Sequence, residues 1–274
     1  MTAPLDPNSL LLFLHVPKTA GTTLKEYVYS VYEPPDAPEE GEGGYFHYGI
    51  YDYYPSDELG EAPPADLQRI MNRPDLRVVV GHFSYGLHAL QPKPATYLTI
   101  LRDPIDRVVS TAAHNLRWSG KEEREVTVQD LERYLLEAQI PDLDNGQTRR
   151  LSGVDAAFGR CTPAMLASAQ EHVRAHFSAV GLTERFEESL VLFARVLGWP
   201  LDLYFTPQQV DSRRASRAEL SADVREMLAE RNHLDVALYD WASAGFEDRI
   251  EREGPGFADD VAALEELRAG VTGR

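Results

Sequence analysis

Cysteine is almost absent from this sequence, which has a single one, Cys161, in 274 residues. One cysteine excludes an intrachain disulfide and a cysteine-rich metal site, and it is typical of proteins in reducing compartments. Long apolar runs are also missing, because the run at residues 10–14 is far shorter than a membrane span. Residues 1–9 lack the basic start and long apolar core of a secretory signal. We therefore expect a cytoplasmic protein without a membrane span.

Positive charge is scarce as well, since 27 Lys and Arg oppose 44 Asp and Glu and leave a formal net charge of −17. This excess of negative charge argues against nucleic acid or an anionic membrane as a partner. It also makes any local cluster of Lys and Arg informative, because a bound anion would need a concentrated positive site. No group of His, Cys and Asp has the spacing of metal ligands, and we expect no metal.

An anion-binding pattern occupies residues 10–24. The apolar run Leu10–Leu14 predicts a buried parallel strand, and a helical pattern follows a short loop. The loop and helix start combine a cation, hydroxyls and backbone N–H groups, in Lys18, Thr19, Ala20, Gly21, Thr22 and Thr23. Helix N-termini attract anions through unpaired N–H groups and the helix dipole. The alternative, a surface lysine at a helix start, is disfavoured by the same dipole. The loop is not a Walker A motif.

Strands alternate with helices along the rest of the chain. Further strands are predicted at 77–80, 97–101 and 179–182. Helices are predicted to begin at Ile105, after a capping box of Thr127 and Asp130, and at Pro163. Three more helices are predicted over 184–197, 224–228 and 234–241. This order predicts a parallel sheet covered on both faces. Ligands bind such sheets beyond the carboxyl ends of the strands. Three of those ends carry polar residues, in 15–23, 81–85 and 102–110.

Residues 102–110 form the second candidate motif. Arg102 at a strand end can hold a phosphate with its fork of donors, and Ser110 can add a hydroxyl two helical turns further on. The alternative is an ion pair at the helix start, between Arg102 and Asp106 or between Asp103 and Arg107. Taken alone, the segment does not decide between these interpretations, although Arg107 fits the structural pair better.

The two motifs together carry a resemblance to sulfotransferases that use 3′-phosphoadenosine 5′-phosphosulfate (PAPS). Residues 16–24 (Val-Pro-Lys-Thr-Ala-Gly-Thr-Thr-Leu) resemble the 5′-phosphosulfate loop of that family, and residues 102–110 (Arg-Asp-Pro-x-x-Arg-x-x-Ser) resemble its 3′-phosphate motif. The closer resemblance is to the branch with heparan sulfate 2-O-sulfotransferases and bacterial polyketide-pathway sulfotransferase domains. That branch is also matched by residues 81–83 (Gly-His-Phe), 145–153 (Asn-x-Gln-Thr-Arg-x-Leu-x-Gly) and 180–184 (Val-Gly-Leu-Thr-Glu).

The resemblance implies an α/β, P-loop NTPase-like three-layer fold with a central parallel β-sheet flanked by helices. It also implies transfer of a sulfuryl group from PAPS to an acceptor hydroxyl, with release of 3′-phosphoadenosine 5′-phosphate (PAP). By position, Lys18 to Thr23 would hold the 5′-phosphosulfate, Arg102 and Ser110 the 3′-phosphate, and Thr183 would lie near the adenine. Whether Arg213 or Arg214 contacts the nucleotide stays open.

His82 is the candidate general base, because an imidazole with an ordinary pKa near 6.5 can accept the proton of an attacking hydroxyl. The alternative is a histidine that only ends a strand. His15 is expected to orient the phosphosulfate loop through a backbone contact. Weaker candidates for substrate contact are Gln147, Arg149, Tyr85 and His88, while Arg150 is assigned a structural or supporting role. The aromatic residues of Tyr45–Tyr54 suit an acceptor wall or a core edge equally well.

We interpret residues 1–274 as a single sulfotransferase domain, with a tail at 1–9, a mobile loop at 33–64 and a peripheral helix or tail at 250–274. The acceptor is a hydroxyl-bearing small molecule, a glycan or a carrier-tethered acyl chain. A neutral sugar, a lipid or a tethered hydroxyl is favoured because a polyanionic acceptor would be repelled. The alternatives are a P-loop kinase or nucleotide hydrolase, which would need Mg²⁺ and a fuller glycine loop, and a catalytically silent nucleotide- or carbohydrate-binding module.

Overall fold

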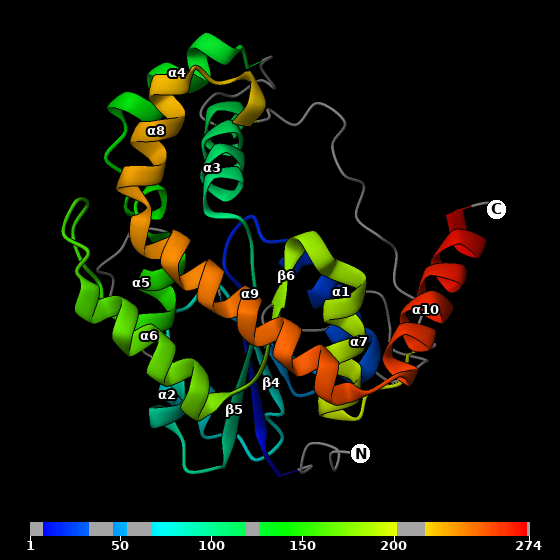
Figure 1. Ribbon diagram of the computed structural model, residues 1–274. Coiled ribbons are helices and arrows are strands. Elements are labelled where there is room, and N and C mark those ends of the chain that lie inside the picture. Colours follow the sequence, from blue (N-terminus) through cyan, green and yellow to red (C-terminus); the bar gives the residue numbers. More distant parts are fainter. Residues whose placement is uncertain (1–7, 33–45, 54–66, 119–125, 202–216, 273–274) are drawn as a thin grey trace.

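The computed structural model describes residues 8–32, 46–53, 67–118, 126–201 and 217–272 (Figure 1). Within these residues, one sheet of six strands has the order β2-β3-β4-β1-β5-β6. The strands are β1 (Leu10–Leu14), β2 (Phe46–His47), β3 (Ile50–Tyr53), β4 (Val78–Gly81), β5 (Ala95–Leu101) and β6 (Phe177–Leu182). β3, β4, β1, β5 and β6 pair in parallel, and β2 pairs antiparallel to β3.

β1 lies at the centre of the sheet, with β4 on one side and β5 on the other. All five of its side chains are fully buried, which explains why the strand reads as a continuous apolar run. Burial of each such leucine contributes about 1.5–3 kcal/mol. The four strands predicted from the sequence are confirmed as β1, β4, β5 and β6, with ends that agree within two residues.

The segment from Tyr45 to Tyr54 contributes to the edge of the sheet. Its described residues form β2 and β3, and β3 pairs in parallel with β4. Ile50, Tyr51 and Tyr53 are buried, so the core-edge interpretation is the one that the structure favours. The prediction of one mobile loop over 33–64 was wrong for 46–53, because apolar alternation in a four-residue strand is too short to be distinguished from a loop. The rest of that loop lies outside the described residues.

Helices cover both faces of the sheet. They are α1 (Gly21–Tyr32), α2 (Leu67–Met71), α3 (Pro104–Trp118), α4 (Val128–Glu137), α5 (Gly146–Ser152), α6 (Pro163–His176), α7 (Phe186–Leu197), α8 (Ala222–Arg231), α9 (His233–Glu253) and α10 (Gly256–Thr272). Short 3₁₀ turns are η1 (Leu87–Leu90), η2 (Pro141–Leu143), η3 (Thr183–Arg185) and η4 (Arg217–Glu219). In Figure 1, α2, α5 and α6 lie to the left of the sheet, and α1, α7 and α10 lie to its right. This confirms the three-layer α/β fold with a central parallel sheet.

The predicted helix starts are confirmed where a local signal exists. Thr127 accepts the N–H of Asp130 at 3.1 Å, and the Asp130 carboxylate accepts the N–H of Thr127, so the capping box precedes α4. Pro163 occupies the first turn of α6, where its missing N–H does no harm. The predicted C-terminal helix exists as α10, which buries Phe257 and Leu264.

A second hydrophobic cluster lies under α3, α4 and α8, separate from the main core of the sheet. Its buried members include Val108 and Val109 of α3, Leu131 and Leu135 of α4, and Leu228 of α8. These helices form the upper group in Figure 1, and α9 runs from them diagonally across the sheet region to α10. In the described residues, no helix has the combined length and apolar character that a bilayer span needs.

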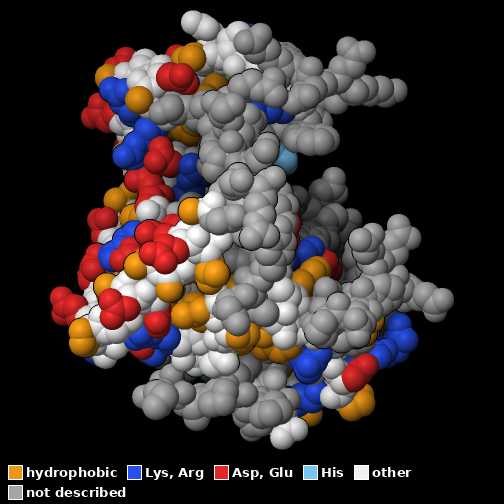
Figure 2. Space-filling view, turned by 90° about the vertical axis from the view of Figure 1, so that its right-hand side faces the viewer, with side chains coloured by type: hydrophobic (Ala, Val, Ile, Leu, Met, Phe, Trp, Pro, Cys, Tyr) orange, Lys and Arg blue, Asp and Glu red, His pale blue; other side chains and the backbone are white. Residues whose placement is uncertain are grey.

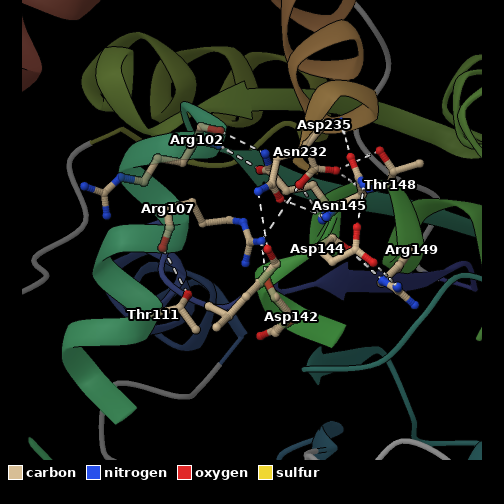
Figure 3. Close-up of polar contacts among 12 residues, drawn as sticks. Arg102, Arg107, Thr111, Asp142, Asp144, Asn145, Thr148, Arg149, Asn232 and Asp235 are labelled. Carbon is tan, nitrogen blue, oxygen red and sulfur yellow. Dashed lines mark hydrogen bonds and ion pairs between the residues drawn. The ribbon is translucent and has the colours of Figure 1, made fainter. Parts of the chain in front are cut away.

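The N-termini of α5 and α9 cap each other (Figure 3). Asn145, in front of α5, accepts the first N–H groups of α9, those of Leu234 and Asp235, at 2.9 and 3.0 Å. In return, the Asp235 carboxylate accepts the N–H groups of Gln147 and Thr148 at 3.1 and 2.7 Å. Both helices thereby satisfy donors that have no partner within their own turn. Asn145 has φ 51, a left-handed conformation that asparagine tolerates.

The same junction buries opposite charges. Arg107 of α3 and Asp235 of α9 are both fully buried, with 3.8 Å between the guanidinium and the carboxylate. Arg149 binds Asp144 at 2.7 Å, and Arg150 binds Asp142 at 3.2 Å. Charges withdrawn from water are tolerated when each has an opposite partner and hydrogen bonds. The Arg107–Asp235 pair joins α3 to α9, the other two pairs hold α5 to residues 141–144 before it, and the mutual cap joins α5 to α9.

Asp235→Ala should destabilise the fold strongly. The change leaves three hydrogen-bond donors of α5 and the charge of Arg107 without their partner, so we expect a loss of about 3–5 kcal/mol in the free energy of unfolding. Urea denaturation followed by circular dichroism measures this loss. Asp240→Ala, at an exposed position of the same helix, is the control and should change the free energy by less than about 0.5 kcal/mol. Equal effects of the two variants would contradict the mutual capping.

Candidate anion-binding and proton-transfer site

The loop between β1 and α1 has a strained backbone. Lys18 and Ala20 have φ of 68 and 63, a left-handed conformation that costs non-glycine residues about 1–3 kcal/mol each. Contacts hold this shape: the Thr19 hydroxyl donates to the Val16 carbonyl at 2.8 Å, and the Thr23 N–H donates to the Ala20 carbonyl at 3.2 Å. Such strain persists where surrounding contacts enforce it, and it is common at ligand clamps. Helix α1, with twelve residues, begins directly after the loop.

Gly21 is required at the start of α1 because the His15 ring occupies the space of a side chain. A Cβ on Gly21 would lie 2.0 Å from Cδ2 of that ring. His15 follows β1, donates its backbone N–H to the Gly81 carbonyl at 2.9 Å and is buried. The predicted backbone contact of His15 therefore leads to β4, and the ring supports the loop by packing. Its Nδ1 is buried and has no hydrogen-bond partner among the described residues.

His82 stands beside His15, at the carboxyl end of β4. The two rings meet edge to face with centroids 4.7 Å apart. Burial, followed by the positive charge of Arg150, lowers the pKa of His82 to about 4. The imidazole is therefore neutral at pH 7 and has a lone pair available for a proton. Gly81 before it is also required, since a Cβ there would lie 1.6 Å from the Tyr53 carbonyl of β3.

Arg102 and Lys18 lie at the same edge of the sheet. The Arg102 guanidinium donates to the Lys18 carbonyl at 3.1 Å, and Figure 3 shows its side chain pointing away from the buried charge cluster. Gln147 holds the Arg102 backbone at both sides, accepting its N–H at 3.0 Å and donating to its carbonyl at 2.9 Å. The first and second sequence motifs, 84 positions apart at these two residues, are thus brought into contact.

Thr183 joins the same edge from the end of β6. Its hydroxyl lies 2.9 Å from the Thr19 carbonyl and 3.0 Å from the Leu101 carbonyl. Thr183 therefore contacts the first motif at Thr19 and the last residue of β5, directly before the second motif. Ser110 is half-buried on α3, and its predicted role stays a prediction. Arg213 and Arg214 lie outside the described residues.

The start of α3 is organised differently from either predicted ion pair. The Asp103 carboxylate accepts the N–H groups of Ile105 and Asp106, both at 3.0 Å, as a helix cap. Arg217 of η4 pairs with Asp103 at 2.8 Å and approaches Asp106 at 3.5 Å. Arg107 pairs with Asp235 instead. Sequence reasoning missed Arg217 at this site, and the arginine-rich segment 213–217 was the only signal for it.

The guanidinium groups of Arg149 and Arg150 bind different partners. The Arg149 guanidinium binds Asp144 and the carbonyls of Ala156 and Ala157, all within the chain. The Arg150 guanidinium instead reaches the carbonyl of His82 at 3.0 Å. This contact with the backbone of the candidate base fits the structural or supporting role expected of Arg150. A substrate contact of Arg149 or Gln147 stays a prediction.

Tyr85 and His88 belong to an aromatic cluster that starts three residues beyond His82. Tyr85 stacks on His172 with centroids 3.7 Å apart, and its N–H donates to the Arg150 carbonyl at 2.8 Å. His88 Nδ1 lies 3.0 Å from the hydroxyl of the buried Tyr97. Their predicted contact with a substrate stays a prediction. In the described part of the chain, no group of three His, Cys, Asp or Glu side chains is arranged to hold a metal ion.

Comparison with known proteins relates the whole chain to sulfotransferases. The family described as galactose-3-O-sulfotransferase matches residues 2–272. Galactosylceramide sulfotransferase of Bos taurus is 32% identical over 185 residues, covering 62% of this chain and 42% of that protein. Galactose-3-O-sulfotransferase 3 of Homo sapiens is 27% identical over 273 residues, covering 92% of this chain and 59% of that protein. The chain thus spans about two-fifths to three-fifths of the length of these curated relatives.

A solved structure, mouse sulfotransferase SULT7A1 complexed with PAP, aligns over 96% of this chain and 90% of its own, with 15% identity and a TM-score of 0.39. The resemblance to sulfotransferases is confirmed at the level of the family. The branch with heparan sulfate 2-O-sulfotransferases and polyketide-pathway domains is not confirmed. Because the matching family spans nearly all of its residues, the chain belongs to the galactose-3-O-sulfotransferase family.

Proposed function

We propose that this chain transfers a sulfuryl group from PAPS to a hydroxyl of a neutral sugar, carried by a glycan or by a glycolipid. The observation that supports this most directly is the meeting of Lys18, Arg102 and His82 at one edge of the sheet, with Arg102 bonded to the Lys18 backbone. Two cations and a neutral imidazole there suit a donor with anionic groups at both ends and a hydroxyl that must lose a proton.

The donor would be held at its two ends. The 5′-phosphosulfate fits the loop from Lys18 to Thr23, because α1 begins there, the N-terminus of a helix attracts anions, and Lys18 adds a positive charge. Arg102 and Ser110 are proposed for the 3′-phosphate, with Thr183 fixing the loop beside the adenine. The contact between Arg102 and the Lys18 carbonyl makes the distance between the two anion sites a property of the fold.

The transfer itself requires one bond to form and one to break. The acceptor oxygen bonds to sulfur while the bond from sulfur to the bridging oxygen of the donor breaks, and the electron pair stays on the departing phosphate. His82 accepts the proton of the acceptor hydroxyl. Lys18 stabilises the negative charge that develops on the departing oxygen. PAP and a sulfate ester are the products.

The acceptor is proposed to be uncharged. The chain has a net charge of −17, and on the face shown in Figure 2 the Lys and Arg side chains are interspersed with Asp and Glu. A polyanionic glycan would be repelled by such a surface. The names of the relatives specify galactose and galactosylceramide, so a terminal galactose is the acceptor to test first. Mass spectrometry of galactose-terminated oligosaccharides and galactosyl lipids, incubated with PAPS and the protein, should show one added sulfuryl group.

Two results, each from that assay combined with a second measurement, would contradict the proposal. A reaction that consumes ATP, requires Mg²⁺ and leaves the sugars unsulfated would indicate a kinase or nucleotide hydrolase. Calorimetric binding of PAP without sulfated product over the whole acceptor panel would indicate a silent binding module.

Lys18→Ala should slow sulfuryl transfer strongly. Loss of a preorganised charge that stabilises the departing oxygen lowers kcat by about 10²–10³-fold, and calorimetry should show weaker binding of PAP. Circular dichroism should show an unchanged fold, because the Lys18 side chain is only half-buried. Arg133→Ala removes an exposed cation of α4 and is the charge-matched control, for which transfer should be unaffected. Normal turnover by Lys18→Ala would remove Lys18 from the mechanism.

His82→Ala should lower kcat by about 10²–10⁴-fold, the usual contribution of a general base, while PAP still binds. In the wild type the base must be unprotonated, and the pKa of His82 lies at about 4. The value of kcat/KM for PAPS should therefore stay level from about pH 7 to pH 5 and fall as the pH drops through that pKa. Stopped assays over this range, on protein checked for folding at each pH, measure the profile. A midpoint near 6.5 would contradict a buried base.

A further inference from the structure

Arg150 connects His82, the candidate base, to helix α5, on which Arg150 lies. Its Nη1 donates to the His82 carbonyl at 3.0 Å, and its Nη2 lies 3.2 Å from Oδ1 of Asp142. Its own carbonyl accepts the N–H of Tyr85 at 2.8 Å. The segment from His82 to Tyr85 is therefore bonded to one residue of α5 at both of its ends. The Arg150 side chain is only 13% exposed, which strengthens these contacts relative to the same contacts in water.

Asp142 is itself held by buried elements. Its carbonyl accepts Nη2 of Arg107 at 2.6 Å, and Arg107 is paired with Asp235 of α9. Asp142 lies in η2, between α4 and α5, so its position depends on three helices. A carboxylate mounted on packed elements keeps its place more accurately than one on a free loop. Asp142 and Arg150 thus present two opposite, fixed charges to the end of β4.

We propose that Arg150 and Asp142 are positioning residues for proton transfer, which hold His82 at the edge of the site and balance the charges around its imidazole. The inference rests on the function proposed above. Arg150 keeps the imidazole unprotonated before the reaction, and Asp142 stabilises the imidazolium that forms when the acceptor proton arrives.

The groups around His82 support this division of roles. Positive charges face it from three elements, at Arg150 of α5, Lys25 of α1 and Lys18 of the loop, and His15 packs against its ring. Among the groups that shift the pKa of His82 most, Asp142 is the negative one. Burial and the cations lower the pKa of His82, whereas Asp142 raises it. An anionic donor would attract a proton to the imidazole, and Arg150 opposes that effect.

The decisive experiment measures the His82 imidazole directly, by ¹H–¹⁵N NMR titration of the full chain without donor. Arg150→Gln removes a nearby cation and should raise the pKa of His82 by about one unit or more. Asp142→Asn, which keeps the shape of the side chain, should shift it in the opposite direction. Arg150→Lys keeps the charge but loses the two-point contact, so the pKa should stay low while kcat falls and KM for PAPS is unchanged. The signal is assigned with His82→Gln, and Arg133→Gln is the control.

Two results would overturn the inference. One is a pKa of His82 that moves in the same direction, or not at all, in folded Arg150→Gln and Asp142→Asn. The other is an Arg150→Lys protein with wild-type kcat. The titration needs no turnover, so it remains decisive if the wild type transfers no sulfuryl group, an outcome that would refute only the proposed function. Conversely, normal sulfation by the wild type, together with an unchanged pKa of His82 in the variants, would refute only the roles of Arg150 and Asp142.

Discussion

Parallel pairing of β1 between β4 and β5 is the constraint on which the candidate site depends. Because parallel strands end at the same edge of a sheet, the pairing brings His15, His82 and Arg102 together, although up to 87 positions separate them. The five buried residues of β1 give this arrangement its stability. Contacts across the edge then refine it, since Arg102 reaches the Lys18 carbonyl and Thr183 reaches those of Thr19 and Leu101.

A buried charge cluster supports that edge from behind. Ion pairs of this kind are weak evidence for stability, because removing charges from water offsets their attraction. Their effect here is one of position: Arg107, Asp235 and Asn145 set α3, α5 and α9 against one another through contacts with defined geometry. An apolar junction would allow small shifts that these hydrogen bonds prevent. This support extends to His82 through Arg150, so residues that stabilise the fold also hold the candidate base.

Two glycines of the site, Gly21 and Gly81, are needed because neighbouring groups occupy the space of a side chain. His15 occupies the volume beside Gly21, and Gly81 lets the Tyr53 carbonyl approach β4. Both glycines belong to motifs that sequence reasoning associated with anion binding or proton transfer. Their immediate role in this structure is steric, since each prevents a clash that would displace a neighbouring strand or ring. Binding at the loop thus depends on packing as much as on charge.

Local patterns in the sequence were sufficient to predict much of the fold and of the candidate site. The continuous apolar run at 10–14 determined a central strand, the capping residues Thr127 and Asp130 determined a helix start, and the lysine loop with residues 102–110 indicated sulfotransferase chemistry. Strands β2 and β3 were missed because a short strand leaves too little periodicity. Only the tertiary structure decided which partners the charged side chains bind. Arg217 pairs with Asp103 across 114 positions, and Arg150 rather than Arg149 reaches His82. Such partners are selected by the packing of distant helices, and no local spacing encodes that choice.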